Sequence, residues 1–103
     1  MYGTVSRYRL KPGSEDQVVV LAREMDQDAP PGYVGGYTFR LDSGSDEYIT
    51  AGVWSDQETY RKNADDERQQ RWFARVRELM AGDPEWNDGE VIFAARGSVA
   101  HTT

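Results

Sequence analysis

Two polar side chains close in the sequence could act on one ligand. Tyr60 and Asn63 are three residues apart, a spacing that places both on the same face of a helix. A phenol and a carboxamide on one face can hydrogen-bond the same molecule, and the indole N–H of nearby Trp54 can donate to an oxygen on a stacked ring. The alternatives are that Trp54 fills the core of an assembly, that Tyr60 packs against a sheet, and that Asn63 is solvated or ends a helix. For each of these three residues, a role in binding or catalysis and a structural role are both open.

Three further residues are candidates for binding a substrate. Arg7 shares one face of an expected strand with Arg9, and could bind a carboxylate or phenolate or pair with one of the abundant acidic side chains. Tyr48 lies on the same strand face as Trp54. Trp86 could cover the mouth of a cavity or dock a partner subunit.

Composition excludes several other kinds of site. The chain has no cysteine, so thiolate catalysis and disulfides are excluded, and its one histidine is His101 near the end. Eighteen acidic against twelve basic residues give a net charge of -6, which disfavours nucleic-acid and anionic-membrane partners. No metal-binding spacing, phosphate loop or nucleophile elbow is present, so we expect no cofactor and no metal.

The first residues lack the apolar core of a signal peptide, and no apolar run approaches the ~20 residues that span a bilayer. A cytoplasmic protein without membrane contact is the expectation.

The hydrophobic pattern predicts one domain over residues 1–96 and a flexible tail over 97–103. Alternating residues predict strands over residues 2–10, 33–41, 48–54 and 90–96. Apolar residues at helical spacing predict a helix that starts at Ser14 and a helical region that starts at Ser55 with a capping box and breaks at Asp65 and Asp66. Residues 87–89 are predicted to form a turn before the last strand.

This order predicts an α+β protein with the ferredoxin-like split βαβ arrangement, β-α-β-β-α-β, and an antiparallel sheet. Helices cover one face of such a sheet, yet both faces of the third strand carry apolar residues: Ile49 and Val53 on one, Tyr48 and Trp54 on the other. We therefore expect two sheets to pack face to face in a homodimer that partly encloses a space.

Two segments carry a family resemblance. The run Arg7-Tyr8-Arg9-Leu10-Lys11-Pro12-Gly13 and the pattern Val53-Trp54-Ser55-x-x-x-x-Tyr60 resemble antibiotic biosynthesis monooxygenase domains, which belong to the dimeric α+β barrel superfamily. As an order of elements, the resemblance covers nearly the whole chain up to about residue 96.

The resemblance implies oxidation of a bound polycyclic phenol or quinol by dioxygen without metal or flavin, with Trp54 at the place of the family's strand-end tryptophan. Some haem-degrading relatives bind iron through a histidine in the helical region after the third strand. No histidine lies before residue 101, so that haem site is not expected here.

The leading interpretation is a homodimeric barrel that binds a small apolar or aromatic ligand and acts as a cofactor-independent monooxygenase. A non-catalytic ligand-binding or structural barrel is the first alternative. A cyclase or isomerase of the same barrel type, which needs an acid or base inside the cavity, is the second.

Overall fold

The structure is a computed structural model and describes residues 1–95 and 97. Four strands and three helices follow one another in the order β1 (Tyr2–Arg9), α1 (Glu15–Gln27), β2 (Tyr33–Arg40), β3 (Glu47–Trp54), α2 (Gln57–Asp65), α3 (Glu67–Arg77) and β4 (Glu85–Glu90).

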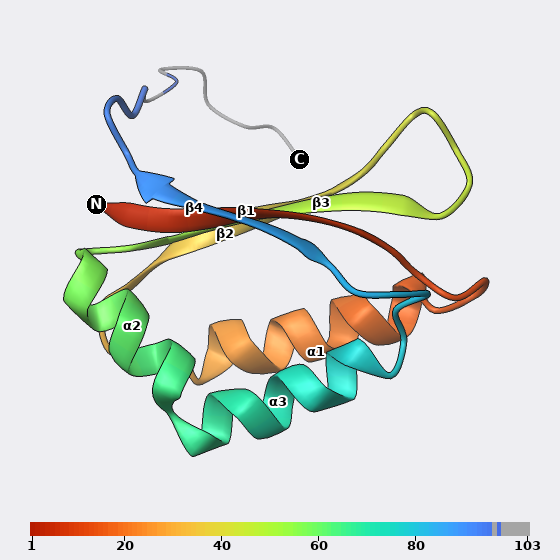
Figure 1. Cartoon of the computed structure of the whole chain (residues 1–103), viewed down its shortest axis with the longest axis horizontal. Coiled ribbons are helices and arrows are strands. Elements are labelled where there is room, and N and C mark those ends of the chain that lie inside the picture. Colours follow the sequence, from red (N-terminus) through yellow and green to blue (C-terminus); the bar gives the residue numbers. More distant parts are fainter. Residues whose placement is uncertain (96, 98–103) are drawn as a thin grey trace.

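The strands form one antiparallel sheet in the order β2-β3-β1-β4. All three helices cover the same face of this sheet, as Figure 1 shows. The predicted ferredoxin-like arrangement is confirmed, and the helical region after β3 is divided into α2 and α3 at Asp66, close to the predicted break.

Alternation along the strands divides the sheet into a covered and an open face. On β1 and β3, the side chains of Tyr8, Tyr48 and Trp54 are buried beneath the helices, while Val5 points to the open face and is 45% exposed. The two strands approach so closely that a Cβ added at Gly3 would lie 2.1 Å from the Gly52 carbonyl oxygen. The hydrophobic core lies between sheet and helices and contains Tyr8, Leu10, Val18, Leu21, Tyr48, Val76 and Met80.

The prediction for the last strand is wrong. It placed the strand at residues 90–96 after a turn at 87–89, whereas β4 ends at Glu90 and includes that turn sequence. Pairing with β1 holds these residues extended, and the Asn87 amide adds a hydrogen bond to the Val5 carbonyl oxygen at 3.1 Å. Long-range backbone pairing therefore outweighs the local turn preference of Asn, Asp and Gly.

The prediction for the start of α2 is wrong by one residue. The N-cap is Asp56, whose carboxylate accepts a hydrogen bond from the Thr59 backbone N–H at 2.8 Å, and not Ser55. Ser14 does precede α1 as expected, but its side chain forms no capping hydrogen bond.

Among the described residues, no helix is long and apolar enough to cross a membrane. The predicted tail at 97–103 lies outside the described residues apart from Gly97, and His101 lies outside them too.

Candidate functional site beside helix α2

Trp54 lies at the end of β3 on the covered face of the sheet and is 5% exposed. Its ring extends back over Gly52, where an added Cβ would lie 3.2 Å from the indole. The rings of Tyr33 and Tyr60 pack edge-on against it, with centroids 5.1 and 5.0 Å away. The sequence fits this geometry because a glycine two residues before a strand-end tryptophan leaves room for the large ring on the same face.

The Trp54 indole N–H is buried and has no hydrogen-bond partner in the described part of the chain. Leaving such a donor unpaired costs about 1–3 kcal/mol. Few buried polar groups remain unpaired in native proteins, and functional sites are one place where they do. This donor therefore keeps a hydrogen-bonding capacity that no described residue uses.

Tyr60 links this tryptophan to the edge of the sheet. Its ring also packs against Tyr2 at 5.3 Å, and its hydroxyl donates a hydrogen bond to the Asp88 carboxylate at 2.9 Å. Burial, followed by the hydrogen bond to Asp88, raises the pKa of Tyr60 to about 12. Tyr60 is therefore a protonated phenol at neutral pH, and it can donate a hydrogen bond but cannot act as a general base.

A cleft of about 790 Å³ lies between α1, the segment that follows it, α2 and α3. We call it the helical cleft. Asn63, in the last turn of α2, lines it and is 9% exposed. The Asn63 carboxamide forms no hydrogen bond with any described residue, so both its donor and its acceptor are available to a ligand. Helix α2 therefore has Tyr60 packed against Trp54 and Asn63 in the wall of the cleft.

Apolar side chains form much of the remaining wall: Met25 of α1, Pro30 and Pro31 after it, and Trp72 of α3. The Trp72 indole N–H donates to the Leu21 carbonyl oxygen at 2.8 Å, which fixes its ring and leaves the ring available for apolar contact.

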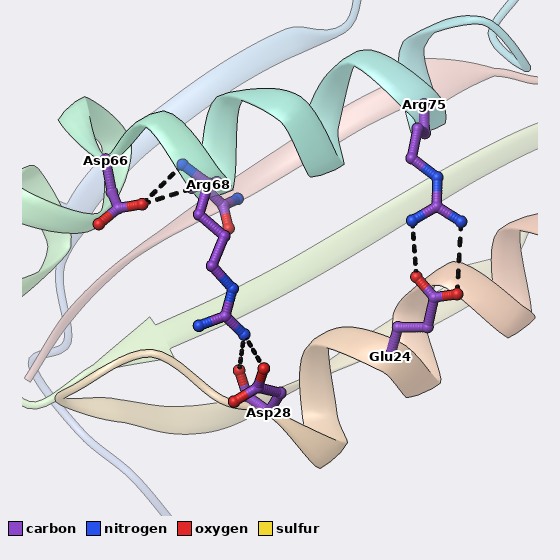
Figure 2. Close-up of polar contacts among 6 residues, drawn as sticks. Glu24, Asp28, Asp66, Arg68 and Arg75 are labelled. Carbon is purple, nitrogen blue, oxygen red and sulfur yellow. Dashed lines mark hydrogen bonds and ion pairs between the residues drawn. The ribbon is translucent and has the colours of Figure 1, made fainter.

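Two ion pairs connect α1 and the segment at its end with α3, as Figure 2 shows. Arg68 pairs with Asp28, and Arg75 forms a bidentate pair with Glu24 at 2.9 and 3.3 Å. Because these four side chains line the cleft, its walls are charged at the surface and apolar around Met25 and Trp72.

The other three candidate residues lie elsewhere. Tyr48 is buried in the core, stacked on Tyr8 at 5.9 Å, and its hydroxyl donates to Glu15 at 2.8 Å. Trp86 is half exposed and packs against Phe73 at 5.4 Å.

Arg7 lies on the open face of the sheet and pairs with Glu47 at 2.9 Å. Of the six candidate residues, Asn63 lines the helical cleft, whereas Arg7, Tyr48, Trp54, Tyr60 and Trp86 do not. The structure thus brings Trp54 and Tyr60 together and places Asn63 on the same helix, while it separates the three binding candidates from them.

Several residues of the site were not identified from the sequence. Asp88 falls in the predicted turn, and neither Trp72 nor the arginines of α3 were among the candidate residues. Tyr33 follows a Pro-Pro-Gly break, which indicates a sharp turn before the next strand. Its contact with Trp54 could not be predicted, because it depends on the pairing of β2 with β3.

Within residues 1–95 and 97, no three His, Cys, Asp or Glu side chains are grouped so that they could hold a metal ion.

Comparisons with known proteins match the fold and not the sequence. No protein-family model and no curated protein matches the chain. The cofactor-independent oxygenase SnoaB from Streptomyces nogalater superposes with a TM-score of 0.71 and 20% identity over 97% of each chain.

Two further solved structures match as well. One, described as an antibiotic biosynthesis monooxygenase, has a TM-score of 0.71 and 16% identity, over 89% of this chain and 99% of its own. A conserved protein from Methanosarcina mazei Go1 has a TM-score of 0.74 and 12% identity, over 85% of this chain and 89% of its own. The chain therefore has the ferredoxin-like α+β fold of the antibiotic biosynthesis monooxygenase-like proteins.

Proposed function

We propose that the protein binds a small aromatic molecule in the helical cleft and oxidises it with dioxygen without a cofactor. The observation that carries the proposal is the buried Trp54 indole N–H, which has no partner among the described residues. Trp54 does not line the cleft itself, but it packs against Tyr60 on α2, whose Asn63 lines the cleft and forms no side-chain hydrogen bond with a described residue. The fold shared with SnoaB, a cofactor-independent oxygenase, supports the reaction type.

The roles of the side chains follow from what each can donate. A phenol gains reducing power when it loses a proton to solvent, so the protein must stabilise the resulting anion. One atom of dioxygen then enters the ring to give a quinone, and the other leaves as water. The Trp54 indole and the Asn63 amide are neutral donors that can hydrogen-bond a phenolate oxygen. Tyr60 keeps its proton and positions the Trp54 ring by edge-on contact. The apolar wall around Met25 and Trp72 offers contact to the aromatic ring of the ligand.

The test is oxygen uptake by the wild type and by Trp54→Phe with a panel of polycyclic phenols and quinols. Phe keeps an aromatic ring in the cluster and removes the indole N–H. We expect uptake to fall at least tenfold in Trp54→Phe, since one oriented donor to a developing anion contributes about 2–4 kcal/mol. Trp86→Phe removes a half-exposed indole that packs against Phe73 and not against Trp54 or Tyr60, and it should retain uptake.

Unfolding in urea distinguishes this role from packing. Trp54→Phe deletes an unpaired buried donor along with part of the ring, so the two effects on the free energy of unfolding oppose one another and we expect a change below about 2 kcal/mol. A larger loss of stability with unchanged uptake would favour the structural barrel. Turnover of substrate under nitrogen would favour a cyclase or isomerase.

We also propose that two chains pair through the open face of the sheet. No described helix covers this face, and Val5, Tyr37 and Phe39 are 45%, 75% and 53% exposed on it beside the half-buried Ile49 and Val53. Ile92 and Phe93, just after β4, are also exposed. A continuous apolar surface of this kind is typical of an interface.

A further inference from the structure

We infer that the helical cleft selects aromatic ligands that carry a carboxylate, and that Lys62 and Arg71 bind this group. The inference rests on the proposed function, because it assigns a substrate class to the same cleft. It follows from the charges around the cleft and from the partners that these charges already have.

Positive charge exceeds negative charge in the cleft. Four cationic side chains line it, Lys62, Arg68, Arg71 and Arg75, against three acidic ones, Glu24, Asp28 and Asp66. The whole chain has a net charge of -6, so this local excess runs against the overall sign. The excess is one charge and counts the lining residues alone, because the acids that pair with Lys62 and Arg71 lie outside the lining.

The three acidic side chains of the cleft already have donors. Arg75 pairs with Glu24 and Arg68 pairs with Asp28, as Figure 2 shows. The Asp66 carboxylate caps α3 by accepting hydrogen bonds from the backbone N–H groups of Arg68 and Gln69, at 2.8 and 3.4 Å. These acids are therefore not available to neutralise the remaining two cations.

Lys62 and Arg71 are paired with acids outside the cleft. Lys62 contacts Glu58 at 3.0 Å and Arg71 contacts Glu67 at 3.3 Å, each one turn along its own helix. All four side chains are at least 66% exposed, and ion pairs at this exposure contribute little to stability. A ligand carboxylate can replace either acid at small cost.

The apolar part of the cleft wall indicates what the rest of the ligand is. Met25, Pro30 and Pro31 offer apolar contact, and the Trp72 ring, whose N–H already donates to Leu21, offers a face for stacking. A ligand that satisfies both parts of the cleft has an aromatic body and an anionic group. Charge-assisted hydrogen bonds to that group should raise the affinity about tenfold or more.

The experiment compares 1-hydroxy-2-naphthoate with 1-naphthol, which lacks the carboxylate, by calorimetric titration at low salt. We expect the naphthoate to bind at least tenfold more tightly to the wild type, and this advantage to shrink as NaCl screens the charges. In the double variant Lys62→Gln with Arg71→Gln, the advantage should fall to less than threefold.

Arg77→Gln is the matched control, because Arg77 lies on the same helix as Arg71 and pairs with Asp83 at 2.7 Å but does not line the cleft. It should keep the full advantage. Equal affinities for the two ligands in the wild type would overturn the inference and leave aromatic binding intact. An advantage that survives in the double variant would overturn the assignment to Lys62 and Arg71. Failure of both ligands to bind would overturn the proposed function together with the inference.

Discussion

Trp54 combines two properties that seldom occur together in a protein core: its ring is enclosed by other aromatic side chains, and its one polar side-chain atom has no partner within residues 1–95 and 97. Packing alone explains the ring, but a phenylalanine would fill the same role without a buried donor. The indole N–H is therefore the atom through which this residue can act on a ligand.

The hydrogen bond between Tyr60 and Asp88 gives a prediction at the scale of single residues. Asp88→Asn should lower the pKa of Tyr60 from about 12, because the carboxylate raises it, while burial keeps it above the ordinary value of about 10. Absorbance at alkaline pH, taken as the difference between each protein and its Tyr60→Phe counterpart, isolates this tyrosine from the others.

The sign of the effect on stability follows from the raised pKa. Folding favours the protonated phenol, so the contribution of Tyr60 is complete below about pH 10 and is lost as the pH rises through about 12. A Tyr60 pKa that does not change in Asp88→Asn would show that Asp88 does not influence the phenol.

At the scale of elements, α2 matters most, because it contributes both Tyr60 and Asn63. Its start is fixed by Asp56, which accepts the Thr59 backbone N–H. This hydrogen bond lowers the pKa of the Asp56 carboxyl, so the cap is charged at neutral pH and also favours the positive end of the helix dipole.

Removal of this cap should destabilise the protein measurably. Asp56→Ala is expected to lower the free energy of unfolding by about 1 kcal/mol, the usual cost of losing an N-cap. Ser55→Ala is the matched control: its hydroxyl lies 3.4 Å from that of Thr59 and caps no backbone group. Urea unfolding of the two variants measures the difference, and an equal loss for both would contradict the assignment of Asp56 as the cap.

At the scale of the whole molecule, the helices leave one face of the sheet uncovered, which Figure 1 makes plain. A single chain would expose the rings of Tyr37 and Phe39 to water there. Pairing of two such faces removes these rings from water. Burial of apolar surface stabilises the pair by about 25 cal/mol per Å².

Assembly is therefore testable by one substitution on this face. Phe39→Glu places a charge in the proposed interface and should shift the protein from dimer to monomer in light scattering at micromolar concentration. Val20→Glu on α1 is the control, since Val20 has the same 53% exposure but lies on a helix. A wild type that is monomeric across the concentration range, or a dimeric Phe39→Glu, would contradict pairing through this face.

Elements with strong local signals were predictable from the sequence. The alternation around Tyr8 and Tyr48, the Pro-Gly breaks and the helical stripe through Trp72 and Val76 follow from local periodicity, and each element that they indicate is present. The predicted resemblance in fold is also matched by solved structures. Periodicity predicts these elements because the residues buried on one face of a strand or helix recur at a fixed spacing along the sequence.

Tertiary structure decided the last strand and the composition of the site. Residues 87–89 prefer a turn in isolation, and only pairing with β1 holds them extended and brings Asp88 to Tyr60. The helical cleft combines α1, α2 and α3, and no local pattern relates Met25 to Asn63 or Arg75 to Glu24.

The sequence by itself thus determined every element except the last strand, the faces that these elements bury and three residues with suitable chemistry. Which of those residues meet depends on the sheet order and on the way the helices pack, because contacts between distant segments arise from the burial and backbone pairing of the whole chain. That is why Trp54 and Tyr60 lie in contact, while Arg7 lies on the opposite face of the same sheet.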